Sequence, residues 1–183
     1  MSYMKTPVLI AALLLGVAGA PAFGAETAAQ LVAKGQAAEK DGDVAGARAA
    51  YTAAVAADPS DPNLRLRLSQ LNEQAAKVAG RGRAKQLADI QIPQVDFDNV
   101  TLSDALDSLG VLTEKASGDK KFSPNFMIQD PTGKLGEQKL SLKVKGVPAK
   151  AVLEMVLSQT GAKARYDEHA VVITSASDKS AEK

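Results

Sequence analysis

The only histidine in the chain, His169, is the one side chain whose ordinary pKa would suit a general base near neutral pH. Nucleophilic catalysis needs an activated serine, cysteine or threonine beside such a base, and a third group that orients the base. The chain has no cysteine, and His169 falls in "YDEHAVV", which the pattern of flanking residues predicts to be a hairpin turn. We therefore expect His169 to be an exposed turn residue without a catalytic role.

The spacing of the acidic residues and glycines does not match a metal-binding or phosphate-binding motif. The two acidic residues before His169 are consecutive with it and cannot converge as an i, i+4 pair would. The segments "DGD" (41–43) and "DPSD" (58–61) are short turns without the twelve-residue spacing of a calcium loop. "GKLGEQK" (133–139) lacks the strand–loop–helix context of a phosphate loop. The sequence thus predicts a non-enzymatic protein without catalytic, cofactor-binding or metal-binding residues.

The charge balance argues against nucleic acid as a partner. The chain has 22 lysines and arginines against 21 aspartates and glutamates, a net charge of +1. Nucleic-acid binding needs a concentrated basic surface. The only basic cluster, "RGRAK" (81–85), is expected to be a solvated helix end or a linker.

The first residues have the pattern of an export signal. Lys5 precedes an apolar run of 13 residues, Val8 to Ala20, and small residues then offer cleavage after Ala22 or Gly24. An uncleaved membrane anchor is the alternative, but the run falls short of the roughly 20 residues that span a bilayer. We predict a cleavable signal peptide over residues 1–24, a periplasmic location, and membrane contact only through partners.

The segment 26–88 is rich in alanine and is expected to be helical. Helices are predicted over about 28–40 and 44–57, separated by "DGD" and ended by "DPSDP", whose prolines stop helical continuation. Asp61 is placed as an N-cap with Pro62 in the first helical position, so a third helix should follow. A plain helical hairpin that only spaces the next domain is one interpretation of this segment.

The same segment resembles one tetratricopeptide repeat. The matching positions in the two helices are Leu31, Gly35, Ala38, Ala47, Tyr51, Ala54 and Pro59. Leu31 and Ala38 depart from the family's usual tryptophan and tyrosine. The resemblance implies that Val32, Gln36 and Glu39 face a binding groove. Because one repeat offers little concave surface, we expect this hairpin to be a spacer or a second contact.

The segment 89–175 changes to a mixed pattern. Extended runs are expected at "IQIPQVDF", "NFMIQD", "KLSLKVK", "AKARYD" and "AVVITS". A helix should begin at Thr101, with Ala105, Leu106, Leu109 and Leu112 on one face, and a second at Pro148, with Val152, Leu153, Val156 and Leu157 on one face. The fold class is therefore α+β, with the order β-α-β-β-α-β-β. The two halves should be separable between Gly80 and Asp89.

This order resembles the short N-terminal domain that secretins share with TonB-dependent transducing receptors. The resemblance rests on "VDFDNVTLSDALDSL", "NFMI" and "LSLKVKGVPAKAVLEMVLSQTGAKARYDEHAVVIT". It implies an envelope docking module, and its core pattern specifies fold better than function. We expect the chain to lack the pore-forming domain of full-length secretins, and the polar tail 176–183 to be disordered.

The resulting prediction is a periplasmic protein–protein interaction or scaffold protein. By resemblance it would be an accessory component of a secretin-based machine, in type IV pilus assembly or type II-like secretion, with a secretin or pilus-assembly protein as partner. The alternative is a periplasmic signalling adaptor of the TonB-receptor and anti-sigma type. Strand addition is the expected mode of docking, and Val171, Val172 and Ile173 are the candidate residues in the αβ segment.

Overall fold

The computed structural model describes residues 26–118 and 122–177 of the chain. The predicted signal peptide and cleavage site, and residues 178–183 of the predicted tail, lie outside these ranges. The α+β class is confirmed. The elements follow in the order α1 (Ala28–Asp41), α2 (Val44–Ala57), α3 (Pro62–Asp89), β1 (Gln91–Thr101), α4 (Leu102–Ser117), β2 (Phe126–Ile128), β3 (Lys139–Pro148), α5 (Ala149–Thr160), β4 (Ala162–Tyr166) and β5 (Val171–Ser175).

The helical segment begins with the antiparallel pair α1 and α2. Thr27 and Gln30 form a capping box at the start of α1, and Gly42 ends the helix with φ 77°, a conformation that favours glycine. The two helices cross closely at Gly35, where a methyl group would lie 2.4 Å from the Tyr51 ring. The small core of this segment consists of Ala47, Tyr51, Leu71 and Val78.

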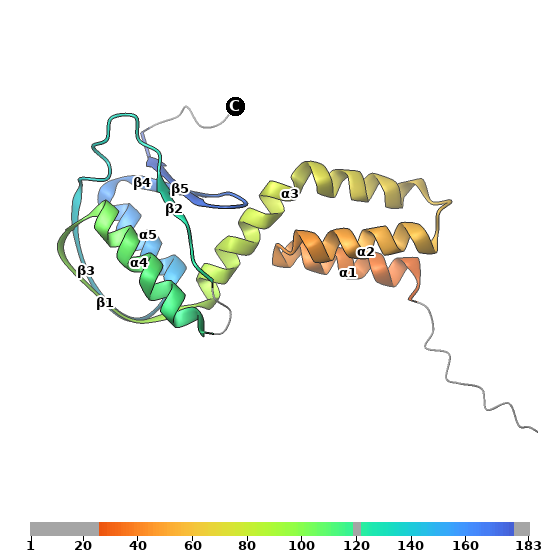
Figure 1. The fold of residues 1–183 in the computed structure, drawn as a ribbon, viewed down its shortest axis with the longest axis horizontal. Coiled ribbons are helices and arrows are strands. Elements are labelled where there is room, and N and C mark those ends of the chain that lie inside the picture. The colour runs from red at the N-terminus through yellow and green to blue at the C-terminus, as the bar shows by residue number, and fades with distance from the viewer. Residues whose placement is uncertain (1–25, 119–121, 178–183) are drawn as a thin grey trace, which may run out of the picture.

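The αβ segment places two helices between two small sheets. The antiparallel pair β1–β3 forms one sheet, and the other has the order β2-β5-β4, with β2 parallel and β4 antiparallel to β5. In Figure 1, α4 and α5 lie between these two sheets. The predicted helix start at Thr101 is confirmed, since its side chain accepts a hydrogen bond from the Asp104 amide, and Gly161 ends α5 in the left-handed conformation.

One apolar core joins both sheets and both helices. The predicted helical stripes are confirmed, since every residue predicted on them is fully buried except Leu112, which packs at the margin. The strands contribute Ile92, Val95 and Phe97 from β1, and Val171 and Ile173 from β5. Burial alternates along β1 only from Val95 to Asp98, and two consecutive exposed residues, Pro93 and Gln94, separate this stretch from Ile92.

The prediction of a linker between the two halves is wrong. Residues 80–89 belong to α3, a single helix of 28 residues that begins in the helical segment and ends against the αβ segment (Figure 1). Leu87 is fully buried in the αβ core, whereas Leu71 and Val78 belong to the helical core. A boundary at residues 88 and 89 therefore falls at the end of a helix that contributes to both cores.

Backbone contacts at glycines fix α3 against its neighbours. A methyl group at Gly80 would lie 2.0 Å from the Tyr166 carbonyl oxygen, and one at Gly42 would lie 2.1 Å from the Gly82 Cα. Since real Cβ atoms do not approach so closely, only glycine permits helix α3 to pass both the β4–β5 turn and the α1–α2 turn at these distances. The junction is a packed joint.

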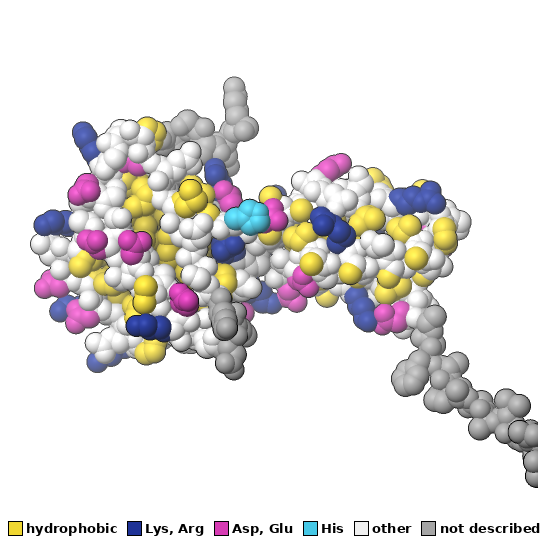
Figure 2. Space-filling model, in the orientation of Figure 1, with side chains coloured by type: hydrophobic (Ala, Val, Ile, Leu, Met, Phe, Trp, Pro, Cys, Tyr) yellow, Lys and Arg dark blue, Asp and Glu magenta, His cyan; other side chains and the backbone are white. Residues whose placement is uncertain are grey.

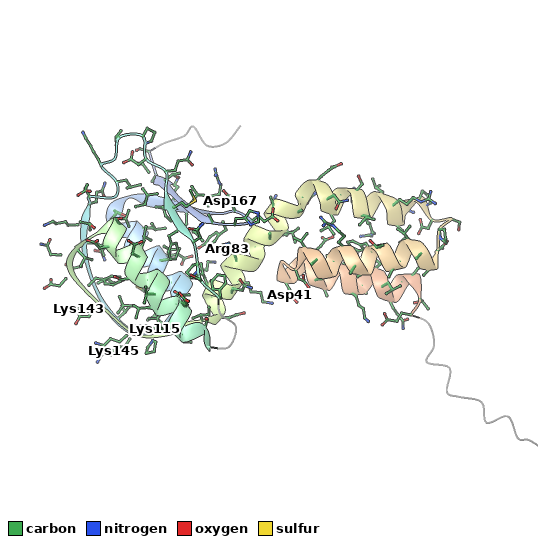
Figure 3. The ribbon with its side chains drawn as sticks, in the orientation of Figure 1. Asp41, Arg83, Lys115, Lys143, Lys145 and Asp167 are labelled. Atoms are coloured by element: carbon green, nitrogen blue, oxygen red, sulfur yellow. The ribbon has the colours of Figure 1, made fainter. Side chains whose placement is uncertain are left out.

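The basic cluster supports the same joint. Arg83 donates from Nη2 to the Glu168 carbonyl oxygen at 2.7 Å and from Nε to the Asp167 carbonyl oxygen at 3.3 Å. Lys85 pairs with Asp41 at 2.5 Å on the other side of the helix. Figure 3 shows Arg83, Asp167 and Asp41 together where α3 meets the two turns. Arg83 is therefore a structural anchor and not the solvated side chain that its sequence context suggested.

Candidate partner-binding surfaces

The predicted groove residues of the helical segment lie between α1 and α3, but not all at one site. Val32 lines an open hollow of about 860 Å³, and Glu39 lines a smaller one of about 150 Å³. Gln36 is exposed on α1 and lines neither hollow. The structure therefore brings Val32 and Glu39 to the same helix–helix groove and leaves Gln36 outside its two hollows.

Tyr51 and Arg67 determine the electrostatics at the Glu39 end of this groove. Burial raises the pKa of Tyr51 to about 12, helped by its hydrogen bond to Glu39 and by the negative charge of that carboxylate. Arg67 acts in the opposite direction on the same hydroxyl. Glu39 is half-buried at this end of the groove, beside the helical core.

The residues of α3 that complete the groove were missed by the sequence analysis. Leu66, Arg67 and Gln70 line the larger hollow, and the side chain of Leu66 is 55% exposed. An exposed leucine beside an arginine in a polar helical turn was the available signal. It was overlooked because the family pattern assigned the groove to the first helix alone.

The prediction that a partner strand adds to Val171, Val172 and Ile173 is wrong. Their strand, β5, is the central strand of its sheet and pairs with β2 on one side and β4 on the other. All three side chains are buried, at 0%, 8% and 0% exposure. Their main-chain groups are used within the sheet, so no added strand can reach them.

The outer edges of the β1–β3 sheet carry features that oppose strand addition. The Ala149 amide donates to the Ile90 carbonyl oxygen. By alternation the main-chain groups of Ile92 and Gln94 therefore point to β3, and those of Pro93 point to the open side of β1. The same alternation turns Pro148 to the open side of β3. Proline offers no N–H to an incoming strand.

Further features protect this sheet. β1 is interrupted by an irregularity between Phe97 and Val100, where Asn99 has φ 53°. The outer face of β3 carries Lys139, Lys143 and Lys145, all exposed. Bulges and lysines are common means of preventing edge-to-edge pairing.

The open side of β4 is partly covered. The Asp167 amide donates to the Ala170 carbonyl oxygen and the Ala176 amide to the Gly161 carbonyl oxygen, so Ala162, Ala164 and Tyr166 turn their main-chain groups away from β5. At the Tyr166 end, α3 passes over this side at Gly80. A partner strand would have to displace the helix there.

The open side of β2 has none of these features. The Val171 amide donates to the Asn125 carbonyl oxygen and the Gln129 amide donates to the Ile173 carbonyl oxygen. By alternation the main-chain amide and carbonyl of Met127 also point to β5. Those of Phe126 and Ile128 point to the open side. The strand contains neither proline nor charge, and Met127 is 53% exposed. Figure 2 shows hydrophobic atoms gathered over β2 and the neighbouring α4.

His169 and the acidic side chains are the groups that the sequence analysis considered for catalysis and metal binding. The His169 side chain is 88% exposed in the β4–β5 turn, 4.0 Å from a Glu168 carboxylate oxygen. Residues 26–118 and 122–177 contain no group of three or more histidine, aspartate or glutamate side chains placed to hold a metal ion. None of the helices in these ranges is both long and apolar enough to cross a bilayer.

No protein-family model matches the sequence, and neither a curated protein nor a solved structure matches the chain.

Proposed function

We propose that this protein is a non-enzymatic, periplasmic interaction protein that serves as an accessory component of a secretin-based machine, in type IV pilus assembly or type II-like secretion. The observation that carries the proposal is the order of elements from β1 to β5: strand, helix, two strands, helix, two strands. This is the order on which the resemblance to the short N-terminal domain of secretins rests. The apolar run near the N-terminus supports export to the compartment where such machines assemble.

The arrangement of surfaces supports docking through the αβ segment. Its β2 edge offers main-chain groups in a fixed sheet, and main-chain pairing gives affinity to partners of varied sequence. The helical groove contributes a second surface, with Val32 and Glu39 in separate hollows. We assign the tetratricopeptide-like hairpin the role of a spacer or second contact, held at a set angle by the packed α3 joint.

The test is crosslinking within the intact envelope of the producing bacterium. A photoreactive amino acid would replace Met127 beside the β2 edge, Leu66 in the helical groove, or Lys143 on the protected sheet, each in the full-length chain. We expect the strongest crosslinks from position 127, weaker ones from position 66 and almost none from position 143. Mass spectrometry of the crosslinked species should identify a secretin or a pilus-assembly protein.

Two outcomes would change the assignment. Crosslinks to an inner-membrane anti-sigma regulator would favour the signalling adaptor, since the same short domain occurs in transducing receptors. Crosslinks to neither class, or recovery of the chain from the cytoplasm after fractionation, would overturn the proposal. Full-length variants are used because α3 contributes to both cores, and a cut within residues 80–89 would interrupt this helix.

A further inference from the structure

The space beside the β2 edge is bounded by α4. A methyl group at Gly110 would lie 3.9 Å from the Pro124 carbonyl oxygen and 4.0 Å from Phe126 Cδ2, so this turn of α4 faces β2. Gly110 adds no side chain there. A strand paired with β2 would therefore continue the sheet over the outer surface of α4.

That outer surface carries two acidic side chains beside the exposed Val111. Asp107 and Glu114 lie three residues before and four residues after Gly110, so helical spacing places them on the same side of α4. Both side chains are exposed, and neither forms an ion pair with another described residue. At the end of β2, Asp130 accepts a hydrogen bond from the Leu135 amide and others from Thr132, which hold the pKa of its carboxyl below the usual value.

The opposite face of the sheet is apolar at the same level. Met127 points away from the core and pairs with Val172 on β5, while Phe126 and Ile128 pack towards the core. Successive side chains of an added strand would alternate between these two faces. One set would meet Met127, and the other would lie over Asp107 and Glu114.

We propose that the β2 edge binds an extended segment of a partner protein in which basic residues alternate with apolar ones. The Phe126 and Ile128 main-chain groups pair with the segment, its apolar side chains cover Met127, and its lysines or arginines lie over the acidic side of α4. The inference rests on the proposed function as an interaction protein, and it adds the site and the chemistry of the bound segment.

The test uses the full-length chain and synthetic ten-residue peptides as probes. The first peptide alternates lysine with valine or threonine, and the second has glutamate in place of every lysine. We expect the lysine peptide to shift the NMR signals of residues 126–128 and Asp107 and to bind at least about tenfold more tightly than the glutamate peptide. Equal binding of the two peptides, or no binding of either at millimolar concentration, would overturn the inference.

Two variants locate the site. Ile128→Pro removes an amide that faces the open side and keeps the amides that pair with β5, so it is expected to abolish binding of the lysine peptide; the NMR signals of Val171 and Ile173 report whether the β2–β5 pairing is kept. Asp107→Lys changes only an exposed helix residue and should weaken binding at least about fivefold. Asp98→Lys, on β1, is the matched control and should leave affinity within twofold.

A second copy of this chain is the competing occupant. Sedimentation of the protein alone would then show a dimer that Ile128→Pro abolishes, and this result would overturn the proposal of a basic partner segment. If the peptides fail but crosslinking still recovers a secretin, the further inference is wrong and the proposed function stands. If the peptides bind but crosslinking recovers neither class of envelope protein, the proposed function is wrong.

Discussion

The two sheets of the αβ segment treat their open edges in opposite ways. The β1–β3 sheet has long strands, its edges carry Pro93 and Pro148, and a row of lysines lies on the outer face of β3. The β2-β5-β4 sheet has α3 packed over one end of β4 but leaves the short strand β2 bare beside an exposed methionine. Both sheets pack on the same apolar core, so core packing does not explain why only one of them has protected edges. Edges that natural proteins do not use are usually protected, and the bare one is therefore the best candidate for a binding edge.

The largest effect should come from the core that the two sheets share. Leu153 is fully buried on α5, so Leu153→Ala should reduce the free energy of unfolding by about 2–5 kcal/mol. Urea unfolding measured by NMR should show both sheets losing structure together. His169→Ala is the control and should cost less than about 0.5 kcal/mol. Separate transitions for the two sheets would break the comparison, because the edges would then belong to independent units.

The next effect concerns the helix that covers the β4 edge. In Gly80→Ala the new methyl group meets the Tyr166 carbonyl oxygen, and we expect a loss of about 1–3 kcal/mol as α3 is displaced. Gly110→Ala is the matched control, since its methyl group would make only ordinary contacts and alanine favours a helix by up to about 1 kcal/mol. Thermal unfolding of both variants measures the difference. A stabilised Gly80→Ala protein would show that α3 does not pack on β4.

The smallest change in stability, and a sharper check of edge protection, comes from Pro93. Pro93→Thr restores an outward N–H on β1 and should alter the free energy of unfolding by less than about 0.5 kcal/mol. It should nevertheless promote self-association, because an unprotected edge can pair with another copy. Sedimentation velocity across a range of concentrations measures this effect. Gln94→Thr, whose N–H faces β3, should remain as monomeric as the original chain.

The sequence predicted most of the elements but little of their assembly. The helical stripes from Ala105 to Leu109 and from Val152 to Leu157 were recognisable because burial on one face imposes a 3.6-residue period. The role of α3 was not, because glycines and basic residues at 80–85 are typical of a linker. Their actual role is to allow backbone contact with Tyr166 and to bind carbonyl groups of a distant turn.

The candidate site shows the same limit more strongly. Val171, Val172 and Ile173 have the composition of an edge strand that could add a partner, but composition is equally typical of a central strand. Only the pairing of both sides of β5 separates the two cases. β2 was predicted as an extended run within "NFMIQD", but its open side could be located only from hydrogen-bond direction in the folded chain.

Amide hydrogen exchange of the full-length protein, followed by NMR, tests the open β2 edge most directly. The account predicts an alternating pattern, with rapid exchange at the amides of Phe126 and Ile128 and slow exchange at Met127 between them. Val171 and Ile173, in the central strand, should exchange slowly throughout. Uniform protection of residues 126–128 would mean that the edge is already occupied within the chain, and it would contradict the assignment of β2 as the binding edge.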